Sequence, residues 1–345
     1  MSQRMIAVCI AGPLLLVLAV LALAVPLPYA AYSPGPTFDI LAKDENESEL
    51  IQVDGHPTYH DDGEIRFTTV QSTPFDDRLS LGEALQRWLD PDEAVIPYDV
   101  AHPDDTTEED EEIQGQLSMV SSQDNAVAVA LEEIGEKVTS AVQVARVNAG
   151  TPADGKLRVR DIFVSIDGEK VKTADDVVRL IQAHEPGEPA EIVVLRNHRR
   201  VTVKVAPEMD EGSPKIGIYP GIGYKFPFDV KIQVNPDIGG PSAGLMFSLA
   251  VYDTLTPGSL TGGEVVAGTG ELMPDGTVGP IGGIEQKIAG AEAVGTDLFF
   301  VPADNCADVS DLDPDLELVK ATTMHEARLA LEAWVADPDA ELPRC

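Results

Sequence analysis

The chain has 345 residues, 43% of them hydrophobic, so it is long enough for two folded domains that each bury a core. Its 24 basic and 59 acidic residues give a formal net charge of −35 at pH 7. An excess of carboxylates of this size repels phosphate groups, which argues against nucleic acid or an anionic lipid surface as a partner.

The first apolar segment runs from Met5 to Val25 and contains no charged residue. As a helix it would be about 31 Å long, which matches a bilayer core of about 30 Å. Arg4 precedes it and acidic sequence follows, so we expect residues 1–28 to be a single-pass anchor in the cell membrane, with the remaining chain extracytoplasmic. The alternative is a signal peptide cleaved after the small-x-small sequence Ala22-Leu23-Ala24.

The next segment, residues 29–124, contains predicted strands at Leu50–Val53 and Glu64–Val70. Two strands are too few to close a sheet alone. We therefore expect Glu64–Val70 to pair with strands after Ile216, so that this segment completes the fold of the last part of the chain.

Two helices are predicted in the same segment. The first covers Leu79–Leu89, with Ser80 as a candidate cap. The second runs from Thr106 to Ile134, and the acidic sequence at Asp104–Glu112 is typical of a solvated helix start, because carboxylates favour the positive end of a helix.

Residues 125–208 have a different pattern. The predicted order is strand, turn, strand, capped helix and β-hairpin, at Ala141–Val147, Asn148–Gly155, Asp161–Ile166, Thr173–Gln182 and Ala190–Val205. This order resembles a bacterial PDZ domain, and the matching motifs are Gly150-Thr151-Pro152-Ala153, Arg160-Asp161-Ile162 and Ile166-Asp167-Gly168. The family usually has glycine where Arg160 stands here.

The PDZ resemblance implies a peptide-binding groove. An extended peptide would add to the strand at Ala141–Val147, beside the first turn of the helix at Asp175–Gln182. The substrate-binding residues implied are Ile134, Gly135 and Val138, whose N–H groups would hold the peptide carboxylate, together with Val142 and Val144. The alternative is a PDZ fold that serves only as a spacer.

The last segment, residues 211–340, contains a serine between small residues, in the sequence Asp237-Ile238-Gly239-Gly240-Pro241-Ser242-Ala243-Gly244. The glycines leave room for a substrate backbone, and Pro241 suits the first turn of a helix. Ser242 would therefore lie near free N–H groups that stabilise developing negative charge.

A base for this serine is expected 45 residues later. Gly282 and Gly283 precede an amphipathic helical pattern that would carry Lys287 inward. To act as a base the lysine must be neutral, so its pKa must fall from about 10.4 to about 7–8, which needs roughly 4 kcal/mol of desolvation or like-charge repulsion. The pattern predicts a Ser–Lys dyad.

These residues resemble the proteolytic domain of the Lon peptidase family. The resemblance covers Phe226 to Asp311 and rests on four motifs in order, Gly240-Pro241-Ser242-Ala243-Gly244, Thr269-Gly270-Glu271, Val278-Gly279-Pro280-Ile281-Gly282-Gly283 and Lys287. It implies that Ser242 is the nucleophile, Lys287 the general base and Thr269 a hydroxyl that orients the lysine. Lon enzymes commonly have an acidic residue where Gly239 stands here, with Asp237 two residues earlier.

Together the resemblances indicate an α+β protein with a PDZ domain and a Lon-type domain, acting as a membrane-anchored serine endopeptidase on extracytoplasmic proteins or peptides. No Gly-x-x-x-x-Gly-Lys-Ser/Thr sequence occurs, so the expected activity is independent of ATP. We expect no cofactor and no metal, and homo-oligomers are a possible assembly. The alternatives are a catalytically silent PDZ scaffold and an α/β-hydrolase-type enzyme that would use His325 with Ser242.

Two cysteines, Cys306 and Cys345, follow the N-terminal apolar segment. An oxidising exterior permits a disulfide between them, which would fix a predicted C-terminal helix at Thr323–Val335 against the protease core. The alternative is two unrelated thiols.

Overall fold

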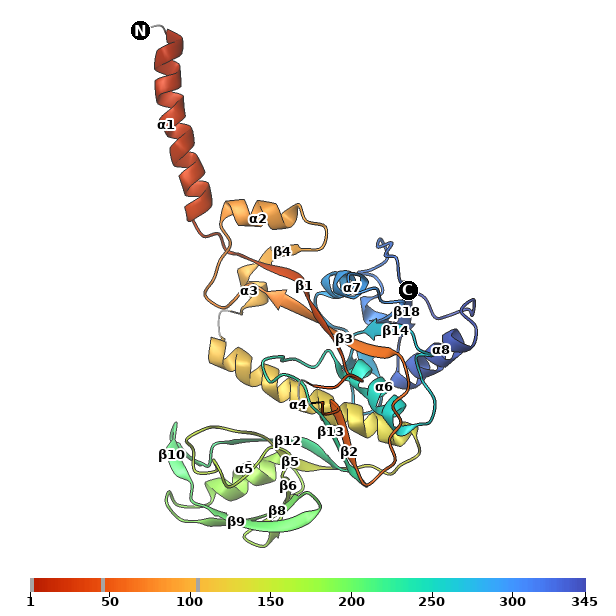
Figure 1. Cartoon of the computed structure of the whole chain (residues 1–345). Helices are drawn as coiled ribbons and strands as arrows, with labels where there is room; N and C mark the ends of the chain where they lie inside the picture. The colour runs from red at the N-terminus through yellow and green to blue at the C-terminus, as the bar shows by residue number, and fades with distance from the viewer. Residues whose placement is uncertain (1–2, 45–46, 104–105) are drawn as a thin grey trace.

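The computed structural model describes residues 3–44, 47–103 and 106–345. A long N-terminal helix, α1 (Gln3–Ala24), projects from the rest of the chain, which forms a larger and a smaller body (Figure 1). The smaller body, residues 139–225, is inserted between two parts of the larger one, and we call it the inserted domain. Both bodies contain helices and strands.

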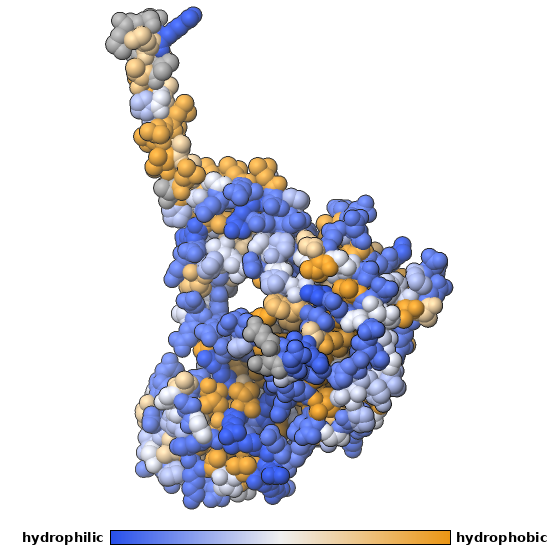
Figure 2. Space-filling view, in the orientation of Figure 1, coloured by the Kyte–Doolittle hydropathy of each residue, from blue (hydrophilic) through white to orange (hydrophobic). Residues whose placement is uncertain are grey.

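Helix α1 carries apolar side chains that are mostly exposed, and Figure 2 shows them on the projecting helix. Among the described residues, however, no helix combines the length and the hydropathy that a membrane crossing requires. The membrane span predicted from Met5 to Val25 is therefore not supported.

The larger body is built on a six-stranded sheet. Its strands, in spatial order, are β18 (Glu317–Ala321), β17 (Leu298–Pro302), β14 (Val265–Gly268), β3 (Glu64–Ser72), β1 (Tyr29–Asp39) and β4 (Ala94–Pro97). Strand β3 is antiparallel to β1 and parallel to β14, with Ile65 opposite Val266. The strand predicted at Glu64–Val70 thus pairs with one after Ile216, as expected, and the sheet needs both parts of the chain.

Helices cover both faces of this sheet. Successive side chains of a strand point to opposite faces, so Phe300 of β17 belongs to one core and Phe299 to the other. Helix α7 (Ile284–Glu292) packs in the core of Phe299. The core of Phe300 receives α4 (Glu108–Glu133), α6 (Gly244–Leu255) and α8 (Met324–Ala336). Helices α6 and α7 therefore approach the sheet from opposite faces.

Two helix starts agree with the sequence prediction. Helix α2 (Leu81–Trp88) begins with a capping box between Ser80 and Glu83, and α4 begins with a capping box between Thr107 and Asp110. Asp104, the start of the acidic sequence, lies outside the described residues. The larger body is completed by short elements, namely α3 (Tyr98–Ala101), η1 (Ala303–Asn305) and the pairs β2 (Ile51–Asp54) with β13 (Asp229–Ile232) and β15 (Glu271–Leu272) with β16 (Val278–Gly279).

The inserted domain has its own sheet and its own hydrophobic core. The strands, in spatial order, are β12 (Ile218–Lys225), β5 (Thr139–Val147), β6 (Ile162–Ile166), β8 (Ala190–Arg196) and β9 (Arg199–Val205), with β7 (Glu169–Lys170) beside β6. Helix α5 (Ala174–Gln182) covers it, and a small hairpin is formed by β10 (Glu208–Asp210) and β11 (Ser213–Lys215). Strand β12, predicted as part of the last domain, thus belongs to this sheet.

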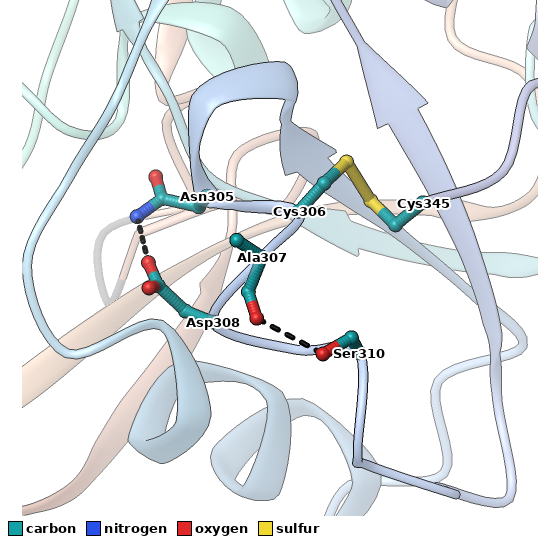
Figure 3. Close-up of a disulfide and its surroundings, with 6 residues drawn as sticks. All are labelled: Asn305, Cys306, Ala307, Asp308, Ser310 and Cys345. Carbon is teal, nitrogen blue, oxygen red and sulfur yellow. Dashed lines mark hydrogen bonds between the residues drawn. A yellow bond between two sulfur atoms is a disulfide. The ribbon is translucent and has the colours of Figure 1, made fainter.

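A disulfide joins Cys306 to Cys345, as Figure 3 shows. The final residues run beside β18, where the N–H of Lys320 donates to the carbonyl of Pro343 at 2.8 Å. The crosslink closes a loop with a sequence separation of 39, which in the chain-entropy model stabilises the fold by roughly 4 kcal/mol. The predicted C-terminal helix corresponds to α8 and lies within this loop.

Candidate active site

Ser242 lies at the end of the loop that leads from β13 into α6. Helix α6 begins at Gly244 with Ala243 as its N-cap residue, so Ser242 immediately precedes the helix. The N–H of Gly244 donates to the carbonyl of Pro241 at 3.3 Å. Within the described part of the chain, the N–H groups of Ser242 and Ala243 donate to no other protein group. These two groups can therefore stabilise negative charge beside the serine.

Lys287 reaches the interior because α7 starts close to β3. Gly283, the N-cap residue, has a φ of 67°, in the left-handed region that favours glycine. A Cβ at this position would lie 2.7 Å from Cγ2 of Val70 in β3. One turn later Lys287 points inward, with only 4% of its surface exposed.

The three residues predicted from the sequence meet in one hydrogen-bonded group. Lys287 Nζ lies 2.7 Å from Ser242 Oγ and 3.0 Å from Thr269 Oγ1. Thr269 follows β14 and donates its hydroxyl hydrogen to the carbonyl of Ser242 at 3.0 Å. Its oxygen is therefore left to accept a hydrogen from the lysine, which fixes the direction of the amine.

Burial lowers the pKa of Lys287 from its ordinary 10.5 to about 7. Desolvation is the cause, since an ammonium group loses its hydration when it is enclosed by protein. A lysine with this pKa is mostly neutral above about pH 7 and can accept the proton of the Ser242 hydroxyl.

Ser242 opens onto a cleft of about 730 Å³ between β1, β3, the serine loop and the turn before α7. Much of its wall is apolar, from Phe38, Phe67, Val70, Met119, Ile238 and Ile281. Carboxylates line it as well, on Glu111, Asp237 and Glu271. Asp237 is exposed and, among the described residues, makes no hydrogen bond to Ser242 or Lys287.

His102, to which sequence reasoning gave no role, is buried in the wall of this cleft. Its Nδ1 lies 3.0 Å from Oε1 of Glu111 and its Nε2 lies 2.9 Å from the carbonyl oxygen of Thr73. Both contacts are to protein acceptors, so His102 ties the start of α4 to the end of β3. No spacing in the sequence indicated this contact.

His325 lies elsewhere. Its Nδ1 is 2.7 Å from Oε1 of Glu133 at the far end of α4, and it is not one of the described residues that line the cleft. The structure places Lys287, and not His325, beside Ser242. The α/β-hydrolase alternative required the histidine there and is therefore wrong.

Both bodies match known families. Residues 117–206 match the family described as the PDZ domain, and residues 233–329 match the Lon protease (S16) C-terminal proteolytic domain. The chain joins a PDZ domain to a Lon-type proteolytic domain. Ser242, Thr269 and Lys287 all lie within the Lon match. The PDZ match overlaps the inserted domain over residues 139–206, and we call the inserted domain the PDZ domain from here on.

Segments of curated Lon proteases are similar to this chain. Lon protease 1 of Sorangium cellulosum is 39% identical over 92 residues, 26% of this chain, and Lon protease 1 of Bacillus subtilis is 34% identical over 101 residues, 28% of this chain. Lon protease of Phenylobacterium zucineum is 27% identical over 194 residues, 55% of this chain. The matched segments span only 11%, 12% and 22% of these relatives.

Among solved structures, the chain is similar to the PDZ domain of an SdrC-like protein from Listeria monocytogenes. The identity is 25%, the TM-score is 0.22, and the match covers 23% of this chain and 84% of that one.

The peptide groove predicted for the PDZ domain is wrong in its position. Strand β5 pairs with β12 on one side and with β6 on the other, so it has no free edge for a peptide. Val142 and Val144 are buried in the PDZ core, Ile134 and Val138 pack against the core of the proteolytic domain, and Gly135 lies exposed between them. These five residues do not form a binding surface.

Strand β12 lies at one edge of the PDZ sheet, and β9 lies at the other. A cavity of about 540 Å³ lies between β12 and α5, and its apolar wall includes Val177, Val178, Ile181, Ile216 and Tyr219. The sequence Lys215-Ile216-Gly217-Ile218 leads into the strand. This glycine between two isoleucines was the sequence feature that could have indicated the groove. It was assigned to the proteolytic domain with the rest of the chain after residue 211.

Proposed function

We propose that the chain is an ATP-independent serine endopeptidase that uses Ser242 and Lys287 as a catalytic dyad. The observation that carries this proposal is the 2.7 Å distance between Lys287 Nζ and Ser242 Oγ in a buried environment that lowers the pKa of the amine to about 7. A buried lysine amine without a carboxylate partner does not stabilise a fold. Beside a serine hydroxyl, however, it can serve as the base that activates the serine for acyl transfer.

The reaction follows from the geometry. Neutral Lys287 takes the proton of Ser242 as Oγ attacks the peptide carbonyl, and the N–H groups of Ser242 and Ala243 stabilise the oxyanion. The lysine then protonates the leaving amine, which breaks the peptide bond and leaves an acyl group on Ser242. Water, deprotonated by the same lysine, then attacks the acyl carbon. The bond to Ser242 Oγ breaks, the lysine returns the proton to Oγ, and the acid is released. Thr269 holds the amine in line throughout.

The PDZ domain is proposed to recruit protein or peptide substrates. An extended peptide would add to the open edge of β12, and apolar side chains would enter the cavity beside α5. The absence of a phosphate-binding Gly-x-x-x-x-Gly-Lys-Ser/Thr sequence supports ATP independence.

We further propose that the catalytic part works outside the cytoplasm at a membrane. The disulfide supports an oxidising compartment. A membrane contact is supported by an exposed apolar row on α2, formed by Leu81, Leu85, Trp88 and Leu89, next to the exposed apolar side chains of α1 (Figure 2).

The membrane contact is tested in a Trp334→Phe variant, in which Trp88 is the remaining tryptophan. In phosphatidylcholine vesicles with brominated acyl chains, the fluorescence of Trp88 should be quenched by the bromine atoms. If, in the presence of these vesicles, Trp88 fluorescence is quenched by acrylamide in the water and not by the brominated lipid, the membrane contact is refuted.

The dyad is tested with a fluorophosphonate probe and a peptide substrate. Ser242→Ala and Lys287→Ala should abolish cleavage while the fold is retained, and only Ser242→Ala removes the acylated atom itself. His325→Ala is the control and should label and cleave at the wild-type rate. A wild-type protein that folds but neither labels nor cleaves would favour the silent scaffold.

The pH dependence gives a second check. The neutral fraction of Lys287 rises through its pKa of about 7, so the acylation rate should rise from pH 6 to pH 8 and then level off. A flat rate from about pH 6 to about pH 9 would exclude the lysine as the base.

A further inference from the structure

Helix α4 holds the backbone of the serine loop through two hydrogen bonds. The N–H of Gly240 donates to the carbonyl of Gly115 at 3.0 Å, and Ser122 Oγ donates to the carbonyl of Pro241, also at 3.0 Å. A Cβ on Gly239 would lie 3.1 Å from the Cα of Gly115. A side chain at position 239 would therefore need α4 or the serine loop to move by a few tenths of an ångström, which disfavours the acidic residue of the Lon pattern at this position.

The next residues of α4 contact the PDZ domain. Asp124 accepts hydrogen bonds from Gln143 Nε2 at 2.6 Å and from Arg160 Nε at 2.7 Å, and Gln123 Oε1 accepts from Arg160 Nη2 at 2.6 Å. Ser122, Gln123, Asp124 and Gln143 are all buried. Buried charged hydrogen bonds of this kind fix the relative position of the two partners.

Arg160 accounts for the second departure from a family pattern. Its φ of 68° lies in the left-handed region, where glycine is favoured and where PDZ domains usually have glycine. The arginine adopts this conformation in a place where its guanidinium group binds α4. Both departures, at positions 160 and 239, thus occur at contacts with the same helix.

The contacts of α4 continue to β12, the strand to which a peptide is proposed to add. Gln143 Nε2 also donates to the carbonyl of Ile222 in β12 at 2.9 Å. Asn125 accepts from the hydroxyl of Tyr224 in β12 at 2.7 Å and donates to the carbonyl of Leu272 at 3.0 Å. One turn of α4 therefore contacts β12 of the PDZ domain, the serine loop at Pro241 and strand β15 at Leu272.

We propose that Ser122, Gln123 and Asp124 are positioning residues for the nucleophile, through which the PDZ domain sets the place of the Pro241–Ser242 peptide. Arg160 and Gln143 hold one side of α4, and Ser122 and Gly115 hold the serine loop on the other. This inference rests on the proposed protease function, and it assigns to the PDZ domain a part in building the active site as well as in recruiting substrates.

The test compares Ser122→Ala and Arg160→Gly with Arg179→Ala, an exposed PDZ arginine that pairs with Glu169 and Asp176 and makes no contact with α4 among the described residues. The first two variants should lower the rate at which a fluorophosphonate phosphonylates Ser242, with release of fluoride, roughly two- to thirty-fold. The pH midpoint of the rate should stay unchanged, because Lys287 keeps its environment. The double variant should lose no more than the larger single loss, since both residues act through one helix.

A second readout does not depend on activity. Amide hydrogen exchange at Gly240, whose N–H is bound by α4, should be faster in Ser122→Ala and Arg160→Gly than in Arg179→Ala. Unchanged hydrogen exchange and unchanged fluorophosphonate labelling in folded variants would overturn the inference, as would multiplicative losses in the double variant. If the wild type is not labelled at all, the proposed function fails, and the exchange rates still decide the role of α4.

Discussion

At the scale of single residues, Lys287 is held in an environment that disfavours its charged form. The difference between the ordinary pKa of 10.5 and a pKa of about 7 corresponds to roughly 5 kcal/mol at about 1.4 kcal/mol per pH unit. The fold therefore stabilises the neutral amine, which is also the state that can remove a proton from Ser242.

This environment predicts that Lys287→Met abolishes acylation and makes the protein more stable. Because the folded pKa lies below the unfolded one, the unfolded state holds more protons between about pH 7 and pH 10.5, and wild-type stability rises with pH in this window. Methionine has no charge to bury, so the gain should be several kcal/mol near pH 6 and should shrink towards pH 10.

Urea unfolding at pH 6 and pH 9 measures this gain. Ser242→Ala is the matched control, since it removes activity and leaves the lysine in place, and its stability should keep the wild-type pH slope. A methionine variant that is less stable than the wild type at pH 6 would contradict the interpretation.

The residues of the dyad could be predicted because their chemistry restricts their neighbours. A nucleophile that a peptide backbone must approach needs small residues around Ser242, and a buried base needs an apolar helix around Lys287. Arg160 and Gly239 could be recognised only as departures from a pattern. Their cause is a contact with α4, made by Arg160 across the domain boundary and by Gly239 within the proteolytic domain, and sequence spacing carries no information about such contacts.

At the scale of elements, the strands β5 and β12 show that a strand's sequence does not determine its position within the sheet. Each forms a strand, and the sequence of a strand does not show whether it lies at the centre or at the edge of its sheet. The order of the sheet decides: β5 is a central strand, whereas β12 is an edge strand. The predicted strands, helices and caps of the PDZ domain were placed correctly, whereas the groove was not.

The β12 groove predicts the effect of a charge on its α5 wall. Val178→Glu should weaken the binding of a peptide with an apolar C-terminal residue by at least about tenfold, or ~1.4 kcal/mol, because a carboxylate would lose hydration in an apolar cavity. Fluorescence anisotropy of the labelled peptide measures the change. Leu329→Glu on α8 is the control, since Leu329 and Val178 are each 45% exposed. Equal affinity in Val178→Glu and the control would exclude this groove.

At the scale of the whole molecule, the central sheet of the proteolytic domain takes β1, β3 and β4 from before the PDZ domain and β14, β17 and β18 from after it. The shortage of strands before residue 124 was enough to predict this sharing. The order of the strands was not predictable, because pairing between distant segments depends on the packing of α6 and α7 on the two faces.

A chain that starts at Glu211 should therefore be insoluble or inactive. It lacks three of the six strands of the sheet and all of α4, so Phe67 and Leu131 are lost from the core. Soluble yield and fluorophosphonate labelling measure the outcome, with the full chain as the reference. A soluble fragment that labels at Ser242 would show that the first part of the chain is dispensable.

The direction of β12 has a consequence for where substrates are cut. A peptide that adds antiparallel to β12, with its carboxylate near Gly217, has its upstream residues directed along the strand towards Lys225, where the chain enters the proteolytic domain. Eight residues of strand span about 27 Å. The proposed groove would then act as a ruler, in which the last residues of a substrate stay bound and only bonds further upstream reach Ser242.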